Sequence, residues 1–152
     1  MDRAPFQVLV LPFTQDSVGN LLYAVFQRAK DTGGYWQFIA GGGKNAETPL
    51  LAAKREAFEE AGITPENEYI LLESMATIPV VNVSGFSWGE NILVIPEHCL
   101  GVHVLNSHLT LSAEHVAYSW ESYEAAQRLL RWDSNKNALW ELDFRLRRNF
   151  NR

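Results

Sequence analysis

Three glutamates close together are the first feature of this sequence that could do chemistry. Glu56, Glu59 and Glu60 are spaced at i, i+3 and i+4. On an α-helix this spacing places the three side chains on one face as neighbours. Carboxylates held so close repel one another, and the repulsion grows as the local dielectric constant falls. Because the cluster offers only oxygen ligands, we expect it to bind a hard cation, Mg²⁺ or Mn²⁺, which bridges readily to phosphates.

The net charge of the chain limits the classes of partner. The sequence has 18 acidic and 13 basic residues and a formal net charge of −5. Nucleic-acid-binding surfaces are electropositive, so we expect no nucleic-acid partner. A polyanionic substrate would need divalent cations between its phosphates and the protein's carboxylates. The alternative is that the glutamates form only the solvated face of a surface helix, as charged helix faces usually do.

The residues around the glutamates predict a helix over about 48–61. Thr48 suits the N-cap, Pro49 suits the first helical position, and Gly62 suits the position just past the end. The expected buried stripe recurs at helical spacing and consists of Leu50, Ala53, Ala57 and Ala61. Directly before this helix, Ala-Gly-Gly-Gly at residues 40–43 predicts a flexible loop.

The remaining segments mix strands with helices. Apolar runs predict strands at residues 6–13, 21–26, 35–39, 69–81, 92–95 and 115–120. Two further helices are expected at residues 122–131 and 134–148, capped by Ser122 and Ser134. The last helix carries an apolar face of Ala138, Leu139, Leu142 and Leu146. This order predicts an α/β sandwich in a single domain over residues 1–152.

Composition also indicates the cellular compartment of the protein. No apolar run approaches the roughly 20 residues of a membrane span, and the N-terminus does not look like a secretion signal, so we expect no membrane partner. The single cysteine, Cys99, has no partner for a disulfide or a zinc site. We therefore expect a cytoplasmic protein, and the sequence leaves open whether it forms a homodimer.

The glycine run and the glutamates together resemble the signature of the Nudix family. The matching residues are Gly41, Glu47, Arg55, Glu56, Glu59, Glu60, Gly62 and Ile63. Ala57 departs from the signature, which prefers a larger aliphatic residue there, and this affects packing under the helix. The resemblance implies a Nudix α/β/α sandwich with a mixed sheet and a loop–helix–loop motif. It also implies Mg²⁺-dependent hydrolysis of a phosphoanhydride bond.

The same resemblance implies roles for individual residues. Glu59 and Glu60 would be the main metal ligands, and Glu56 would be a third ligand or an acid–base participant. Arg55 would orient a glutamate through a fork-shaped pair. The backbone carbonyl of Ala40 would also face the metal.

A second, looser resemblance covers the C-terminal third. Residues 111–120, followed by Trp132 and residues 134–135, look like the Nudix branch that acts on dihydroneopterin triphosphate or dATP. In this branch Glu114 would be a further metal ligand or the general base, and the alternative is an ordinary loop carboxylate. We expect His115 to pack or to form a hydrogen bond rather than to act as a base. The remaining histidines, in a segment expected to be irregular, show no ligand pattern and are His98, His103 and His108.

Substrate phosphates and rings need contacts beyond the metal. Arg28, Lys30 and Arg3 are candidates for cationic contacts to phosphate, although each could equally be ordinary surface charge. Trp36 is a candidate aromatic platform for a base or pterin ring.

These expectations lead to one reaction and two kinds of rival. Water would attack a phosphorus of a nucleoside triphosphate or a related X-linked diphosphate, releasing pyrophosphate and a monophosphate. Dihydroneopterin triphosphate or dATP is the first expectation for the substrate. The rivals are a Nudix hydrolase of ADP-ribose, dinucleotides or oxidised nucleotides, and a non-catalytic Nudix-like binding module. Such modules commonly lose signature carboxylates, and this sequence has all of them.

Overall fold

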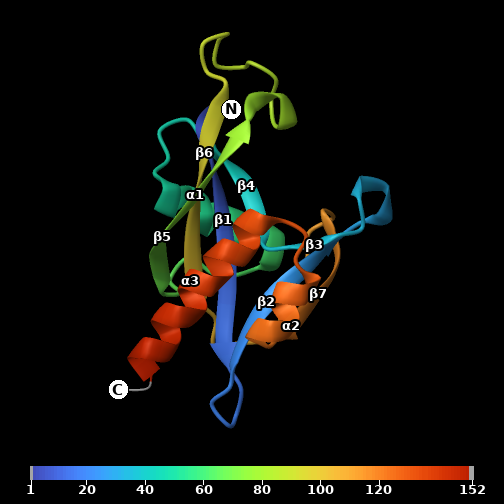
Figure 1. The fold of residues 1–152 in the computed structure, drawn as a ribbon, viewed down its shortest axis with the longest axis vertical. Helices are drawn as coiled ribbons and strands as arrows, with labels where there is room; N and C mark the ends of the chain where they lie inside the picture. The colour runs from blue at the N-terminus through green and yellow to red at the C-terminus, as the bar shows by residue number, and fades with distance from the viewer. Residues whose placement is uncertain (1, 151–152) are drawn as a thin grey trace.

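A seven-stranded mixed sheet forms the centre of the protein, whose computed structural model describes residues 2–150 (Figure 1). The path through the sheet is β3-β2-β1-β6-β5, with β4 paired to β1 and β7 paired to β2. The strands are β1 (Arg3–Gln15), β2 (Leu21–Arg28), β3 (Trp36–Gln37), β4 (Ile39–Lys44), β5 (Tyr69–Pro79), β6 (Val94–His103) and β7 (His115–Glu121). β1 and β6 run parallel, whereas the other pairings are antiparallel. One edge of β1 pairs with β4 near its start and with β2 near its end.

Helices cover both faces of this sheet. α1 (Pro49–Ala61) packs on one face, and α2 (Tyr123–Leu129) and α3 (Asp133–Phe150) pack on the other. In Figure 1, α3 crosses the near face and α1 lies behind the strands. Side chains of β1 alternate between the two cores, with Val8 and Val10 towards α1 and Leu9 and Leu11 towards α3. The predicted α/β/α sandwich is confirmed.

The capping residues at its two ends set the boundaries of α1. The Oγ1 of Thr48 accepts a hydrogen bond from the Leu51 backbone N–H at 3.2 Å, and Pro49 occupies the first turn. Gly62 ends the helix with φ of 69°, a left-handed conformation that glycine adopts without strain. The predicted buried stripe is partly wrong, since Leu50 is 42% exposed. The helix rests on the sheet through its small residues, including Ala52, and Leu50 in the first turn lies outside that contact.

Two segments expected to be irregular are strands. Residues 40–43 belong to β4 and are not a flexible loop. The strand expected at 92–95 begins at Val94 and continues to His103, so His98 and His103 lie in β6. In both segments pairing with β1 supplies the order, since β6 keeps a continuous parallel register with β1 from Glu97 to His103.

The other boundaries shift by smaller amounts. Residues 80–82 form a 3₁₀ turn, η2 (Val80–Asn82), instead of extending β5, and a second 3₁₀ turn, η1 (Lys30–Thr32), follows β2. Ser122 caps α2 as predicted, through a 3.2 Å hydrogen bond from the Ala125 N–H. Ser134 is not a cap, because α3 already begins at Asp133. Among residues 2–150, the helices are too short or too polar to cross a membrane.

Candidate active site

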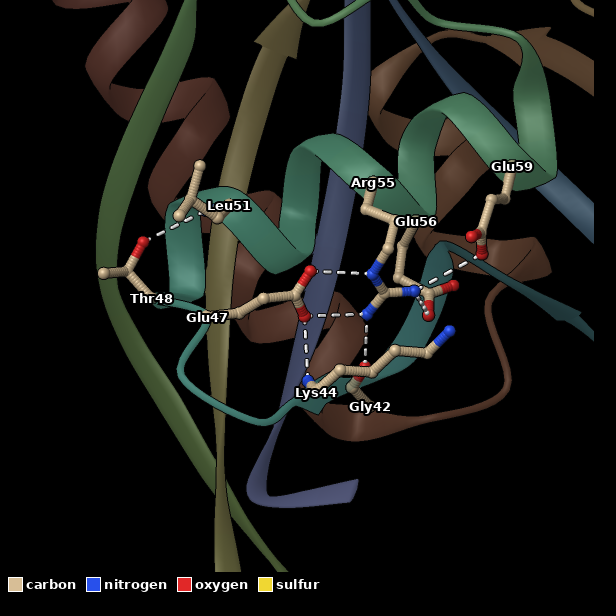
Figure 2. Close-up of polar contacts among 8 residues, drawn as sticks. All are labelled: Gly42, Lys44, Glu47, Thr48, Leu51, Arg55, Glu56 and Glu59. Atoms are coloured by element: carbon tan, nitrogen blue, oxygen red, sulfur yellow. Dashed lines mark hydrogen bonds and ion pairs between the residues drawn. The ribbon is translucent and has the colours of Figure 1, made fainter. Parts of the chain in front are cut away.

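Arg55 is the centre of a polar network between β4 and α1. Its Nε and Nη2 donate to the two carboxylate oxygens of Glu47 at 2.8 and 3.0 Å, forming a fork-shaped pair (Figure 2). Nη2 also donates to the carbonyl of Gly42 at 2.8 Å. Nη1 donates to Glu56 at 2.9 Å and to Glu59 at 3.3 Å. One guanidinium therefore holds the glycine strand, the turn before α1 and two signature carboxylates in a fixed arrangement.

The glycines of β4 allow α1 to approach the sheet closely. A Cβ added to Gly41 would overlap the carboxylate of Glu56, and one added to Gly43 would overlap the ring of Phe6. A Cβ on Gly42 would overlap the guanidinium of Arg3. None of the three has a positive φ, so here glycine is required for space and not for an unusual backbone conformation. Gly41 leaves room for the Glu56 carboxylate beside the strand.

Glu60 is a buried carboxyl without a hydrogen-bond donor. It is 3% exposed, and neither of its oxygens has a partner. Glu59 is one residue earlier, rotated by about 100° around the helix, and its side chain is 50% exposed. Burial, followed by the effect of the neighbouring Glu114 carboxylate, raises the pKa of Glu60 to about 10. The pKa of Glu114 is lowered, chiefly by its contact with Glu60.

Backbone hydrogen bonds bring Glu114 to this place. The N–H groups of Thr110 and Ser112 donate to the carbonyls of Ala61 and Glu60 at 3.0 and 3.2 Å. These bonds tie the segment before β7 to the C-terminal end of α1 and satisfy carbonyls that a helix end leaves free. The exposed residue Glu114 follows directly, beside the buried Glu60.

Arg28 is the arginine whose charge acts on both Glu60 and Glu114. It pairs with His115 across β2 and β7 and lies within electrostatic range of Glu60 and Glu114. Its Nε is buried without a hydrogen-bond partner. His115 itself is 4% exposed and packs on the ring of Phe26, with burial lowering its pKa. His115 therefore packs in the core, with its Nε2 also 3.3 Å from the Nε2 of Gln37.

The oxygen donors in this cluster fit a hard divalent cation. The two orphaned oxygens of Glu60 lack any positive partner, and a cation would supply one. The cluster is not closed around an ion as it stands: within residues 2–150, no three acidic, His or Cys side chains converge closely enough to enclose one. Glu56 and Glu59 are turned towards Arg55. The half-exposed Glu59 has room to turn away from Arg55.

A cleft of about 790 Å³ reaches this site through Arg28, whose charge acts on Glu60 and Glu114; the lining of the cleft includes none of the four clustered glutamates. Arg28 and Ala40 line it, and so do the aromatic residues Tyr35 and Trp132, whose rings meet edge to face at 5.2 Å. Its floor includes Gln7 and Glu97 from the two central strands. A smaller hollow of about 330 Å³ lies at the opposite end of β2, where no residue of α1 reaches it.

The other candidate substrate contacts fall outside the lining of this cleft. Trp36 packs, partly buried, against the core on the α3 side, while its neighbour Tyr35 faces the cleft. Lys30 is exposed in η1. Arg3 does not line the cleft, but its Nη2 donates to the Oε1 of Gln7, which does, at 3.2 Å.

The arrangement of carboxylates, glycine strand and cleft agrees with the comparison to known families. A family model described as the NUDIX domain matches residues 6–141. The chain belongs to the Nudix family. A Nudix hydrolase structure from Listeria monocytogenes is 40% identical, has a TM-score of 0.84 and covers 96% of this chain and 97% of its own.

Curated and solved relatives place this Nudix protein near one branch. The dihydroneopterin triphosphate diphosphatase of Haemophilus influenzae is 28% identical over 144 residues, covering 93% of this chain and 89% of that protein. The structure of the Escherichia coli dihydroneopterin triphosphate pyrophosphohydrolase has a TM-score of 0.72 at 23% identity, covering 90% of this chain and 93% of that one. The predicted likeness to this branch and the prediction of a Nudix-type pyrophosphohydrolase are confirmed.

Sequence reasoning did not identify Glu97 and Gln7 as residues that line the cleft. Glu97 lay in a stretch that looked irregular, and Gln7 lay in an apparently plain apolar strand. One signal was present: Ile95, Glu97 and Cys99 alternate along β6 and are all buried, so a carboxylate stands where an apolar residue would be expected.

Replacing Gly41 by alanine in this Nudix protein is expected to lower kcat/KM at least about tenfold, because the new Cβ must displace the Glu56 carboxylate. Gly43→Ala is the matched control in the same strand, since its Cβ meets the ring of Phe6. The control should lose stability by roughly 1–3 kcal/mol through overpacking and keep most of its activity. Kinetics and urea unfolding of both variants measure this difference. Equal losses of activity would contradict the role given to Gly41.

In cation-free buffer, the free energy of unfolding should fall as pH rises from about 5 to about 9. The pKa of Glu60 is about 10 in the folded chain, whereas an unfolded glutamate titrates near roughly 4.3. Between these values the folded chain holds a proton that the unfolded chain has released, so stability declines by up to ~1.4 kcal/mol per pH unit.

Urea unfolding in EDTA at pH 5, 7 and 9 measures this slope. Other groups titrate as well, so the informative quantity is the difference between the parent and Glu60→Gln. The variant lacks the titrating carboxyl and should show a shallower decline. Parallel curves for the two proteins would show that Glu60 titrates normally.

Proposed function

We propose that this Nudix protein hydrolyses a phosphoanhydride bond in a small nucleoside triphosphate or a related X-linked diphosphate, with Mg²⁺ or Mn²⁺ as cofactor. A triphosphate gives pyrophosphate and a monophosphate, whereas an X-linked diphosphate gives two monophosphates. The observation that carries the proposal is the buried, donor-free carboxyl of Glu60 facing Glu114, both within electrostatic range of Arg28, which lines the cleft. A carboxyl buried in this way is costly unless a cation compensates it.

Different residues would bind the cation and the substrate's phosphates. Glu56, Glu59, Glu60 and Glu114 would hold the cation together with the carbonyl of Ala40, which lines the cleft. The bound cation would polarise the bridging phosphates and lower the pKa of a water molecule. Arg28 would contact the substrate's phosphates from the side of β2.

Arg55 and the acidic groups have separate tasks in this proposal. Arg55 is a positioning residue, because its fork on Glu47 fixes the carboxylate of Glu56 beside Gly41. Glu114 is one candidate for general base, since it is exposed at the edge of the site and its lowered pKa keeps it ionised. Glu56 is the second candidate, with a pKa raised by burial towards the operating range of a base.

Dihydroneopterin triphosphate is the proposed substrate, with dATP as the alternative within the same branch. The support is the naming of the curated relatives that cover about nine tenths of this chain as dihydroneopterin triphosphate diphosphatases. A cytoplasmic location stays an untested prediction. The lone Cys99 is buried and unpaired, which is consistent with a reducing compartment.

A substrate panel tests this proposal. Dihydroneopterin triphosphate, dATP, ADP-ribose, a diadenosine polyphosphate and an oxidised nucleotide are incubated with the protein in Mg²⁺, in Mn²⁺ and in EDTA, and the products are separated. We expect pyrophosphate plus a monophosphate from a triphosphate, with turnover lost in EDTA. Preferential cleavage of ADP-ribose or the dinucleotide would favour the rival Nudix substrates.

The binding-module rival is tested by comparing the parent with Glu59→Gln. The proposal expects the parent to turn over at least one substrate and the variant to lose most of that rate. If both proteins are equally inactive across the panel while the parent binds a nucleotide, the chain is a binding module.

A further inference from the structure

A chain of three hydrogen-bonded polar side chains ends in the floor of the cleft. Arg3 donates to the Oε1 of Gln7 at 3.2 Å, and the Nε2 of Gln7 donates to the Oε2 of Glu97 at 2.8 Å. Because Arg3 can only donate, it fixes the orientation of the Gln7 amide, and the amide group therefore faces Glu97 with its donors. Gln7 and Glu97 are register partners on the parallel strands β1 and β6. The backbone of both strands thus holds the pair in place.

Glu97 is an unusual residue for the floor of a cleft. It is 4% exposed, and within residues 2–150 it forms no salt bridge. Gln7 is its one hydrogen-bond donor in this part of the chain, and it reaches Oε2 only. The cleft in front is open, and Glu97 lines it. A buried carboxylate with a free oxygen facing a cleft is a site for a ligand that brings hydrogen-bond donors.

We propose that Glu97, held by Gln7, binds the neighbouring ring N–H and 2-amino N–H of a guanine- or pterin-type ring and so selects these rings over adenine. This inference deepens the proposed function and rests on the cleft being its substrate site. A 2-amino-4-oxo ring presents two parallel N–H donors, which match the two oxygens of a carboxylate. Adenine presents an acceptor nitrogen at the corresponding ring position, which a carboxylate repels.

The position of Glu97 suits the ring end of a substrate. Glu97 lies on β6, and Ala40 and Gly41 lie on β4. Because β1 pairs with both strands, β4 and β6 are two strand spacings apart in the sheet, a distance of roughly 10 Å. Separate side chains would therefore bind the phosphate end and the ring end of the substrate. Tyr35 and Trp132 line the same cleft, and Trp132 is 44% exposed, which leaves aromatic surface for the ring.

Three substrates with identical sugar and triphosphate groups test the proposal: dGTP, dITP and dATP. dITP lacks the 2-amino group, and dATP lacks both donors. In Mg²⁺ the parent should show kcat/KM values in the order dGTP, dITP, dATP, with each lost contact to the charged acceptor costing roughly 10- to 100-fold. Glu97→Gln should lower the value for dGTP by a similar factor, mostly through KM, and change the value for dATP less than about threefold.

Two outcomes would overturn the proposal. One is a parent that hydrolyses dATP as efficiently as dGTP. The other is a Glu97→Gln variant that loses activity on all three substrates equally, which would assign Glu97 a structural role. If the variant does not fold, the comparison of dGTP with dITP on the parent still decides the question.

A binding measurement separates this inference from the proposed hydrolysis. Quenching of tryptophan fluorescence by dGMP and by dAMP is measured in EDTA, where neither cation nor turnover is needed. The parent should bind dGMP at least about tenfold more tightly than dAMP, and Glu97→Gln should bind the two alike. A preference for dGMP in a protein without hydrolytic activity would support the ring site and count against the enzyme. Equal binding by the parent would refute the ring site even if hydrolysis is found.

Discussion

Replacing Glu60 by glutamine is expected to reduce cation-dependent kcat/KM at least ~100-fold while leaving the cation-free protein at least as stable as the parent near pH 7. Loss of groups that merely support metal ligands costs about 10- to 100-fold, and loss of a ligand should cost no less. Glutamine is neutral and close in shape to the protonated carboxyl that burial enforces at this position. The folded state therefore loses little when the cation is absent.

The matched control for this experiment is Glu66→Gln, since Glu66 is an exposed residue beyond the end of α1. Kinetics in Mg²⁺ and thermal melts in EDTA are measured for the parent and both variants. The control should match the parent in both assays. A Glu60→Gln protein that keeps its activity, or that melts far below the parent in EDTA, would show that the carboxyl has a structural task instead.

Replacing Arg55 by lysine is expected to cost roughly 2–3 kcal/mol of stability and about 100-fold in kcat/KM. Removing one partner of a buried ion pair typically costs 3–5 kcal/mol, and we lower that figure because the side chains of Arg55 and Glu47 are 20% and 21% exposed. Lysine keeps the charge but cannot reach Glu47, Gly42 and Glu56 together, as the guanidinium does. The loss of activity follows because the carboxylate of Glu56 and the strand carrying Gly42 are no longer aligned.

Arg145→Lys provides the control, because Arg145 pairs with Glu141 and Glu73 on α3 and β5, away from the site. This pair is partly buried, with Arg145 33% and Glu141 13% exposed, so the variant should lose some stability but keep the activity of the parent. Urea unfolding and kinetics are measured on both variants. Equal effects of the two substitutions would remove the special role of Arg55.

Local signals made the signature helix predictable from the sequence. Thr48, Pro49 and Gly62 act through backbone groups within one turn of themselves, so their meaning does not depend on the rest of the fold. The spacing of Glu56, Glu59 and Glu60 likewise fixes their order around the helix. Which of them is buried was not predictable, because the sheet and the segment carrying Glu114 decide it.

The features that sequence reasoning missed depend on partners far away in the chain. Gly41 and its neighbours looked like a loop, because only α1 packed above them shows that glycine is needed for space. β6 looked short, because its second half is ordered by parallel pairing with β1. Trp36 and Tyr35 are adjacent in sequence, and their alternation on opposite sides of the chain decides which ring faces the cleft.

The account depends most on one claim, that the carboxyl of Glu60 helps to hold a divalent cation. Mn²⁺ binding followed by electron paramagnetic resonance, with Mg²⁺ as competitor, tests it directly on the parent and on Glu60→Gln. The account predicts that the parent binds Mn²⁺, that Mg²⁺ displaces it, and that the variant binds at least about tenfold more weakly. A parent that binds no Mn²⁺, or a variant that binds it as tightly as the parent, would contradict the claim.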